Sequence, residues 1–339
     1  MPRVQGQSFI RLLIVTVVTV SSLVSTACNA GARGKTTNAA HALSTKEATN
    51  AANNPTPMNT QQTVESRLPW NEVQNWAYWL DNPDLKQLSA STFDLLVIDS
   101  SADGSAAQAF SAEQIKTLRQ THPRRRVVAY LSIGQAESYR GYWQPGWRPG
   151  SPTWLGAEDP HWHGNYWVKY WDPVWQQVIY HYLDAIIAAG FDGIYLDRID
   201  AYQESYAAGH EDAMVQFVTS LAQYARAHSS LGEDFGIIAQ NAEDLAGSYP
   251  DYVRLVTGIG REEVYVQATD IPTSQAERAQ AEHYLDLFRQ NSRGKLVLTV
   301  DYATRPDLVC AASQRARIKG YVPFVTDVGL DRLPGNPSC

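Results

Sequence analysis

From Trp70 onward, short apolar runs rich in β-branched and aromatic residues alternate with amphipathic stretches. This alternation predicts repeated βα units and a parallel sheet. Eight apolar runs predict strands, at residues 76–80, 93–99, 126–133, 193–197, 236–240, 256–260, 296–301 and 322–326. Apolar residues at spacings of three and four predict helices at residues 112–120, 173–189, 211–227, 273–290 and 308–319. Eight strands favour a closed (β/α)8 TIM barrel over an open doubly wound sheet.

Length and composition fit one such α/β barrel. The chain has 339 residues, of which 44% are hydrophobic, so we expect a single large domain over residues 68–339. The net charge of −7 argues against a nucleic-acid partner, because a polyanion needs a basic surface. Ten Trp and eighteen Tyr supply aromatic faces of the kind that stack on sugar rings, with core packing as the alternative role. We expect a monomer.

The N-terminal segment has the pattern of an export signal. Arg3 and Arg11 are followed by a largely apolar run over residues 12–24, too short to span a membrane permanently. Residues 1–28 therefore predict a signal peptide. Its end is similar to a lipobox, in which Cys28 would be lipidated and anchor the protein to a membrane facing the periplasm or the cell exterior. The small residues 25–27 also fit ordinary signal peptidase, so free secretion is the alternative.

Residues 29–67 are rich in Ala, Asn, Thr and Gln and have no apolar period, which predicts a disordered tether. Besides Cys28, the chain has two cysteines, Cys310 and Cys339. In an oxidising compartment we expect these two to form a disulfide that fixes the C-terminal tail, with two free buried thiols as the alternative.

Polar residues recur where the predicted strands end. They are Asp99, Ser132 with Glu137 soon after it, Asp197, Gln240 with Asn241, Glu262 with Glu263, and Asp301 with Tyr302. The C-terminal strand ends of a (β/α)8 barrel form its active-site face, so we expect these side chains to surround one active site. Capping of the next helix is the alternative role, which we accept for Asp244 and Asp103.

Two of these carboxylates are candidates for catalysis. Asp197 ends an apolar strand and shares a face with Tyr195, because side chains alternate along a strand. Glu262 lies two predicted strands later, after glycines that leave room for a ligand. Two carboxylates on nearby strand ends are what cleavage of a glycosidic bond requires. An ion-pair network with Arg198 and Arg261 is the alternative.

The segment 135–172 is long for a loop in a compact barrel and carries ten aromatic residues. It predicts a wall that binds sugar, or a lid packed on its own rings. His161 and His163 lack a third ligand at matching spacing, and no nucleophile elbow, phosphate loop or His-Glu-x-x-His motif is found. We therefore expect neither a metal nor a cofactor.

At these motifs the chain resembles the glycoside hydrolase family typified by endo-α-1,4-polygalactosaminidase, in its bacterial and archaeal branch. The resemblance runs from about Trp70 to Asp327. Its carriers are AYLSIGQAE at 129–137, WVKYWDP at 167–173, GFDGIYLD at 190–197, QNA at 240–242 and GIGREE at 258–263. The chain departs from the family at Gln135, where an acid is common.

The resemblance implies hydrolysis of an α-1,4-linked, galactosamine-containing polysaccharide with retention of configuration. It implies Asp197 as the nucleophile and Glu262, directly after Arg261, as the acid/base. Retention requires the two carboxylates about 5 to 5.5 Å apart, and inversion roughly 6.5 to 9.5 Å. We expect substrate to be bound by Tyr78, Asp99, Tyr130, Ser132, Glu137, Tyr195, Asp200, Asn241, Arg261, Asp301 and Tyr302.

A polymer with free amino groups is cationic, which agrees with a cleft lined by Asp99, Glu137, Asp200 and Asp301. Two other functions stay open from the sequence. One is a glycosidase that acts on another α-linked cell-surface glycan. The other is a non-catalytic, sugar-binding lipoprotein.

Overall fold

Eight parallel strands form the central sheet, in the order β1-β2-β3-β7-β8-β9-β12-β13. They are β1 (Trp76–Trp79), β2 (Leu95–Ile98), β3 (Arg126–Ser132), β7 (Gly193–Asp197), β8 (Gly236–Gln240), β9 (Gly258–Glu262), β12 (Leu296–Tyr302) and β13 (Val322–Thr326). The computed structural model describes residues 66–290, 294–334 and 339. The order and direction of the strands confirm the predicted TIM barrel fold.

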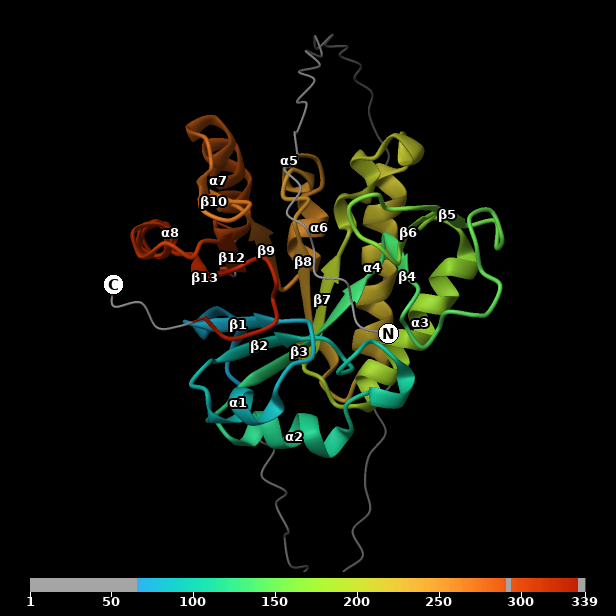
Figure 1. The fold of residues 1–339 in the computed structure, drawn as a ribbon, viewed down its shortest axis with the longest axis horizontal. Coiled ribbons are helices and arrows are strands. Elements are labelled where there is room, and N and C mark those ends of the chain that lie inside the picture. Colours follow the sequence, from blue (N-terminus) through green and yellow to red (C-terminus); the bar gives the residue numbers. More distant parts are fainter. Residues whose placement is uncertain (1–65, 291–293, 335–338) are drawn as a thin grey trace, which may run out of the picture. The chain divides into compact units, whose positions relative to one another are not determined.

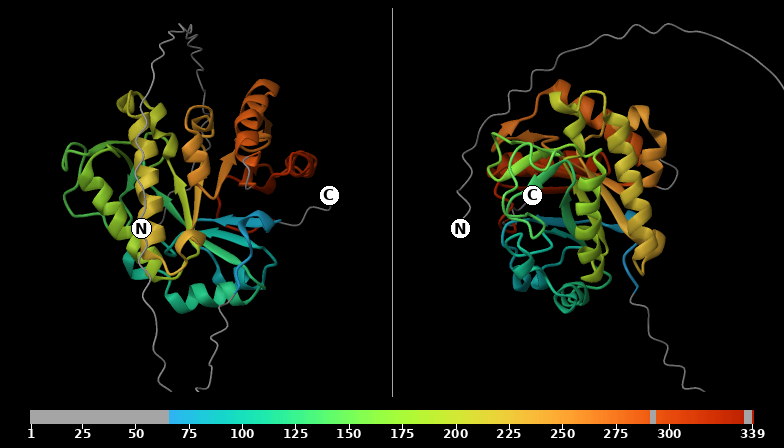
Figure 2. Two further views of the ribbon diagram at one scale, coloured as in Figure 1. Left: turned by 180° about the vertical axis from the view of Figure 1, so that it is seen from behind. Right: turned by 90° about the vertical axis from the view of Figure 1, so that its right-hand side faces the viewer.

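Helices lie around the outside of this sheet (Figures 1 and 2). They are α1 (Leu85–Ala90), α2 (Ala112–Gln120), α3 (Pro173–Ala188), α4 (Glu211–His228), α5 (Leu245–Ser248), α6 (Pro250–Leu255), α7 (Gln275–Arg289) and α8 (Pro306–Ile318). Local sequence sets several helix starts. Ser111 begins α2 and Ser274 begins α7, each through a capping box, while Asp172 caps α3 directly before Pro173.

The barrel closes between β1 and β13 through side chains. The described strands show no ladder hydrogen bonds between these two, and the indole Nε1 of Trp76 instead donates to the carbonyl oxygen of Val322 at 3.0 Å. The Trp76 ring also packs against Phe324, with centroids 5.6 Å apart. Trp76 is fully buried, so it both packs in the core and joins the first strand of the barrel to the last.

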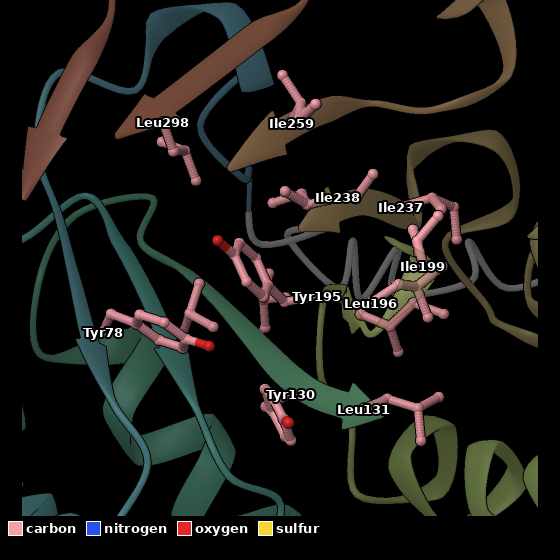
Figure 3. Close-up of a cluster of buried hydrophobic side chains, with 14 of the residues drawn as sticks. Tyr78, Tyr130, Leu131, Tyr195, Leu196, Ile199, Ile237, Ile238, Ile259 and Leu298 are labelled. Carbon is pink, nitrogen blue, oxygen red and sulfur yellow. The ribbon is translucent and has the colours of Figure 1, made fainter. Parts of the chain in front are cut away.

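Aromatic side chains fill the inside of the barrel. The rings of Tyr78 and Tyr195 lie 5.2 Å apart, and Trp76 stacks on Tyr78 at 5.7 Å. Figure 3 shows the rings of Tyr78, Tyr130 and Tyr195 close together. Gly260 is required opposite them, because a Cβ at that position would lie 2.0 Å from the hydroxyl oxygen of Tyr195.

The structure corrects the predicted element map at β9 and in the segments that follow β3 and β9. β9 begins at Gly258 and ends at Glu262, two residues later than predicted, because Val256 still caps α6. The segment after β3 contains a small antiparallel sheet of β4 (Gln135–Glu137), β6 (Asn165–Val168) and β5 (Leu155–Glu158). The hairpin of β10 (Val266–Gln267) and β11 (Ile271–Pro272) follows β9.

The predicted signal peptide, Cys28 and residues 29–65 of the tether lie outside the described residues. Arg67, at the predicted end of the tether, is part of the folded domain, because its Nε donates to Asp192 at 2.5 Å. The predicted disulfide between Cys310 and Cys339 is confirmed. Within residues 66–290 and 294–334, no helix combines the length and apolar character needed to cross a membrane.

Candidate active site

Asp197 is the last residue of β7 and lies half-buried at the mouth of the barrel. Its Oδ2 accepts a hydrogen bond from the Tyr130 hydroxyl at 2.5 Å, and its Oδ1 accepts one from the backbone N–H of Arg198 at 2.7 Å. Both carboxylate oxygens therefore have a donor. These two contacts fix the orientation of the carboxylate.

Glu262 is the last residue of β9, at the same end of the sheet. Its Oε2 accepts from Gln240 Nε2 at 2.7 Å and from Asn241 Nδ2 at 3.0 Å. Its Oε1 accepts from the hydroxyl of Tyr302. Three donors on β8, directly after β8 and on β12 thus hold one carboxylate. Sequence reasoning placed Gln240 among the polar strand ends of the active-site face, but named only Asn241 and Tyr302 as substrate-binding residues.

The environment of Asp197 raises its pKa, so that both the ionised and the protonated form are present near neutral pH. Loss of hydration and, to a smaller extent, the nearby charge of Glu262 raise its pKa to about 7, against the opposing effects of Arg198 and of the Tyr130 hydrogen bond. The interaction between the two acids agrees with their positions at the ends of β7 and β9. A raised carboxyl pKa beside a second acid is typical of sites that move protons.

Glu263 is bonded outside this set of side chains. Its backbone is left-handed, with φ of 60°, and its Oε1 accepts from the backbone N–H of Ala268 at 3.0 Å. The structure thus places Glu262, rather than its neighbour, among the polar side chains at the barrel mouth.

Part of the negative charge of the predicted acidic lining is offset by Arg140, a residue that sequence reasoning missed. Arg140 is buried and donates to Asp99 at 2.7 Å through Nη1 and to Glu137 at 2.5 Å through Nε. Burial raises the pKa of Asp99, against the charge of Arg140. Arg140 also lies 5.7 Å from the centroid of Tyr130, so this buried ion-pair cluster supports the tyrosine that contacts Asp197. No local sequence signal marked Arg140, because its partner Asp99 lies 41 positions earlier in the chain.

Two other predicted substrate-binding residues are buried and bonded to the protein. Asp301 has no exposed surface, and its Oδ1 accepts from the backbone N–H groups of Tyr265 and Val266 at 2.6 and 2.9 Å. It thereby holds the segment that follows β9. The hydroxyl of Ser132 donates to the carbonyl of Gln135 at 3.2 Å. The structure gives both residues a positioning role within the fold.

The remaining predicted binding residues surround the two acids. Tyr78 donates to Gln240 at 2.9 Å, and Arg261 pairs with Glu243 at 2.7 Å. Asp200 lies 3.8 Å from Arg198. Tyr195, whose buried hydroxyl has no hydrogen-bond partner in the described structure, lies beneath the site.

Three aromatic side chains, Trp167, Trp171 and Tyr206, form a wall close to Asp197. The Trp167 and Tyr206 centroids are 5.5 Å apart, and those of Trp171 and Tyr206 are 6.4 Å apart. The guanidinium of Arg198, the residue after Asp197, lies 4.5 Å from the centroid of Trp167. Tyr206 is 38% exposed, so part of this aromatic wall is open to a ligand.

Other aromatic rings of segment 135–172 pack on one another. Trp147 makes edge contacts with Trp143 and Trp154, at centroid distances of 5.3 and 4.8 Å. Trp154 is buried and also contacts Trp175. Segment 135–172 therefore combines a self-packed cluster with two half-buried rings, Trp167 and Trp171, that line up with the exposed Tyr206. Within the described residues, no group of three or more His, Cys, Asp or Glu is arranged to hold a metal ion.

A (β/α)8 barrel with paired carboxylates at its C-terminal strand ends is a common framework of glycoside hydrolases. The model of glycoside-hydrolase family GH114 matches residues 55–336, which is most of the chain. The chain belongs to glycoside-hydrolase family GH114. This membership confirms the resemblance in the sequence and the assignment as a glycoside hydrolase.

Relatives from distant organisms share most of the chain. An uncharacterized protein of Deinococcus radiodurans is 40% identical over 287 residues, which cover 83% of this chain and 90% of the relative. An uncharacterized protein of Thermotoga maritima is 37% identical over 289 residues, covering 80% of this chain and 87% of the relative.

Two solved structures share the fold. The glycoside hydrolase domain of PelA from Pseudomonas aeruginosa aligns with a TM-score of 0.59 and 19% identity, covering 77% of this chain and 97% of that domain. Ega3 of Aspergillus fumigatus, solved in complex with galactosamine, aligns with a TM-score of 0.58 and 19% identity, covering 80% of this chain and 98% of that one.

The raised pKa of Asp197 predicts how pH changes stability. The folded-state pKa is about 7, whereas a carboxyl group in an unfolded chain titrates near pH ~4. Between these values the folded protein binds a proton that the unfolded chain lacks, so this group's contribution to stability falls as pH rises. Asp197→Asn removes this pH-dependent loss of stability, because the amide does not titrate. We expect the melting temperature of the variant, minus that of the wild type, to increase from about pH 4 to about pH 7.

Thermal unfolding followed by circular dichroism measures this difference. Asp301, whose pKa burial also raises to about 7, titrates in both proteins, so its contribution cancels in the comparison. A melting-temperature difference that stays constant across the range would contradict the raised pKa of Asp197.

Proposed function

We propose that this glycoside hydrolase cleaves an α-1,4-linked, galactosamine-containing polysaccharide with retention of configuration. The observation that carries the proposal is the pair of oriented carboxylates, Asp197 and Glu262, at one mouth of the barrel. A fold shared with Ega3, which was solved in complex with galactosamine, supports this class of substrate.

In this mechanism the ionised Asp197 attacks the anomeric carbon while Glu262 donates a proton to the departing glycosidic oxygen. The products of this step are a glycosyl ester on Asp197 and a leaving group with a free hydroxyl. Glu262, now a carboxylate, then takes a proton from water, which cleaves the ester and restores both residues. The Tyr130 and Arg198 donors hold the Asp197 carboxylate in place before the attack.

The surroundings of Asp197 suit an amino sugar. The aromatic wall offers ring faces for stacking on the apolar side of a pyranose. Beside it, Asp200 and Glu204 lie 3.8 and 3.9 Å from Arg198, so two carboxylates face one guanidinium. This local excess of negative charge, together with the net charge of −7, supports a cationic glycan as substrate.

The experiment that tests this function is digestion of defined α-1,4-linked galactosamine oligomers. Wild-type protein should shorten them, and Asp197→Asn should abolish turnover because it removes the nucleophile with little change of shape. Glu262→Gln should lower the rate by roughly 10²- to 10⁴-fold, the usual share of a general acid. Product lengths by mass spectrometry and initial rates give the result.

Glu263→Gln is the matched control, since it changes the adjacent carboxylate, which accepts from the backbone N–H of Ala268. It should keep near-normal activity. Inactive Glu263→Gln with active Glu262→Gln would reverse the assignment, and turnover by Asp197→Asn would refute the nucleophile. Wild-type protein that binds the oligomers without cleaving them would favour a sugar-binding function instead.

We further propose that the enzyme is exported by the signal over residues 1–28 and anchored through a lipid on Cys28, with residues 29–67 as a tether. The apolar run, the cysteine that follows it and the Ala- and Asn-rich segment support this location. Cys28→Ala should move the protein from the membrane fraction to the soluble exported fraction, measured by fractionation and immunoblotting. Wild-type protein that is already soluble would contradict the lipid anchor.

A further inference from the structure

The two oxygens of the Glu262 carboxylate have different partners. Oε2 faces two amide groups, Gln240 Nε2 and Asn241 Nδ2. Oε1 faces one hydroxyl, that of Tyr302. An amide nitrogen only donates hydrogen bonds, whereas a hydroxyl can donate or accept. The two oxygens are therefore unequal places for a proton.

The orientation of the Asn241 amide is fixed by its other contacts. Asn241 Oδ1 accepts from the backbone N–H of Glu262 at 3.1 Å and from Arg261 Nη1 at 3.3 Å, and both of these groups are obligate donors. Asn241 must therefore direct its Nδ2 towards Glu262. Gln240 takes the same orientation, with its Nε2 towards Glu262 and its Oε1 accepting from the Tyr78 hydroxyl at 2.9 Å, because the opposite orientation would set its amide oxygen against the ionised carboxylate.

A proton on Oε2 would point at two N–H donors that cannot accept it. It would also cost the hydrogen bonds that Oε2 accepts, and an unsatisfied polar group at a half-buried position is unfavourable. A proton on Oε1 keeps both amide contacts. The Tyr302 hydroxyl then rotates and accepts from Oε1, or remains a donor while Oε1 gives its proton to another group.

Tyr302 is well placed to serve as the hydrogen-bond partner of Glu262 Oε1. It is the last residue of β12, which pairs with β9 through Val300 and Glu262, and it is 93% removed from solvent. Burial and the neighbouring charge of Glu262 raise the pKa of Tyr302, so the hydroxyl keeps its proton. The ring is fixed by the strand while the hydroxyl hydrogen is free to turn.

We propose that Tyr302 is a positioning residue that confines the exchangeable proton of Glu262 to Oε1. This inference rests on the proposed role of Glu262 as acid/base. In the first step the Oε1 proton moves to the glycosidic oxygen as the C1–O bond breaks and the Asp197 ester forms, and the Tyr302 hydroxyl donates to the new carboxylate. In the second step a proton from water returns to Oε1.

The test compares Tyr302→Phe with wild type on two substrates that differ in their need for protonation. One is an α-1,4-linked galactosamine oligomer, whose leaving sugar requires an acid. The other is an aryl α-galactosaminide with a strongly acidic phenol, which departs without one. We expect kcat/KM on the oligomer to fall roughly 10- to 100-fold and kcat/KM on the aryl substrate to fall less than about 3-fold.

Tyr321→Phe is the matched control, because it removes a hydroxyl that bonds to Asp286, on α7, at 2.7 Å. It should leave both rates near those of wild type. Equal losses on both substrates by Tyr302→Phe would indicate a structural or sugar-binding hydroxyl and overturn the inference. No loss on either substrate would overturn it as well. Wild-type protein that is inactive on both would instead refute the proposed function, and the inference with it.

Discussion

The parallel register of β7, β8 and β9 is the constraint on which the site depends. Leu196 pairs with Ala239 and Gln240 pairs with Gly260, so Asp197, Gln240 and Gly260 lie at one level of the sheet. Residues at one level face the same side, and Glu262, two residues beyond Gly260, faces that side too. The missing side chain of Gly260 leaves space between the acids for the hydroxyl of Tyr195. A shift of β9 by one residue would bring Glu263 inward.

Backbone strain is concentrated at the same strand ends. Arg198, Asn241 and Glu263 follow β7, β8 and β9, and each has a positive φ, of 61°, 56° and 60°. Left-handed backbone costs a non-glycine residue about 1 kcal/mol or more, so these residues are held there by surrounding contacts. This backbone conformation lets the Arg198 N–H donate to Asp197 and Asn241 Nδ2 donate to Glu262. The Glu263 carboxylate instead accepts from the N–H of Ala268. Strain of this kind is typical of functional sites.

Much of this could be predicted from the sequence because it depends on local pattern. Apolar runs predicted the eight strands, and spacings of three and four predicted helices between them. The polar residues at the strand ends included Asp197, Glu262, Asn241 and Tyr302. The contacts between distant residues could not be predicted. Asp99 and Glu137 suggested an open acidic lining, and only the fold brings Arg140 between them. The short strands of segment 135–172 carry too few residues for a period to be visible.

The central claim is that Asp197 and Glu262 cleave an α-linked amino-sugar polymer through a covalent intermediate on Asp197. Proton NMR of the reaction with an α-1,4-linked galactosamine oligomer tests it most directly, because the anomeric signal of the first product appears before mutarotation. A two-step mechanism predicts that the new reducing end is initially the α anomer. An initial β anomer would show inversion by a single attack of water, and would contradict the assignment of Asp197 as nucleophile.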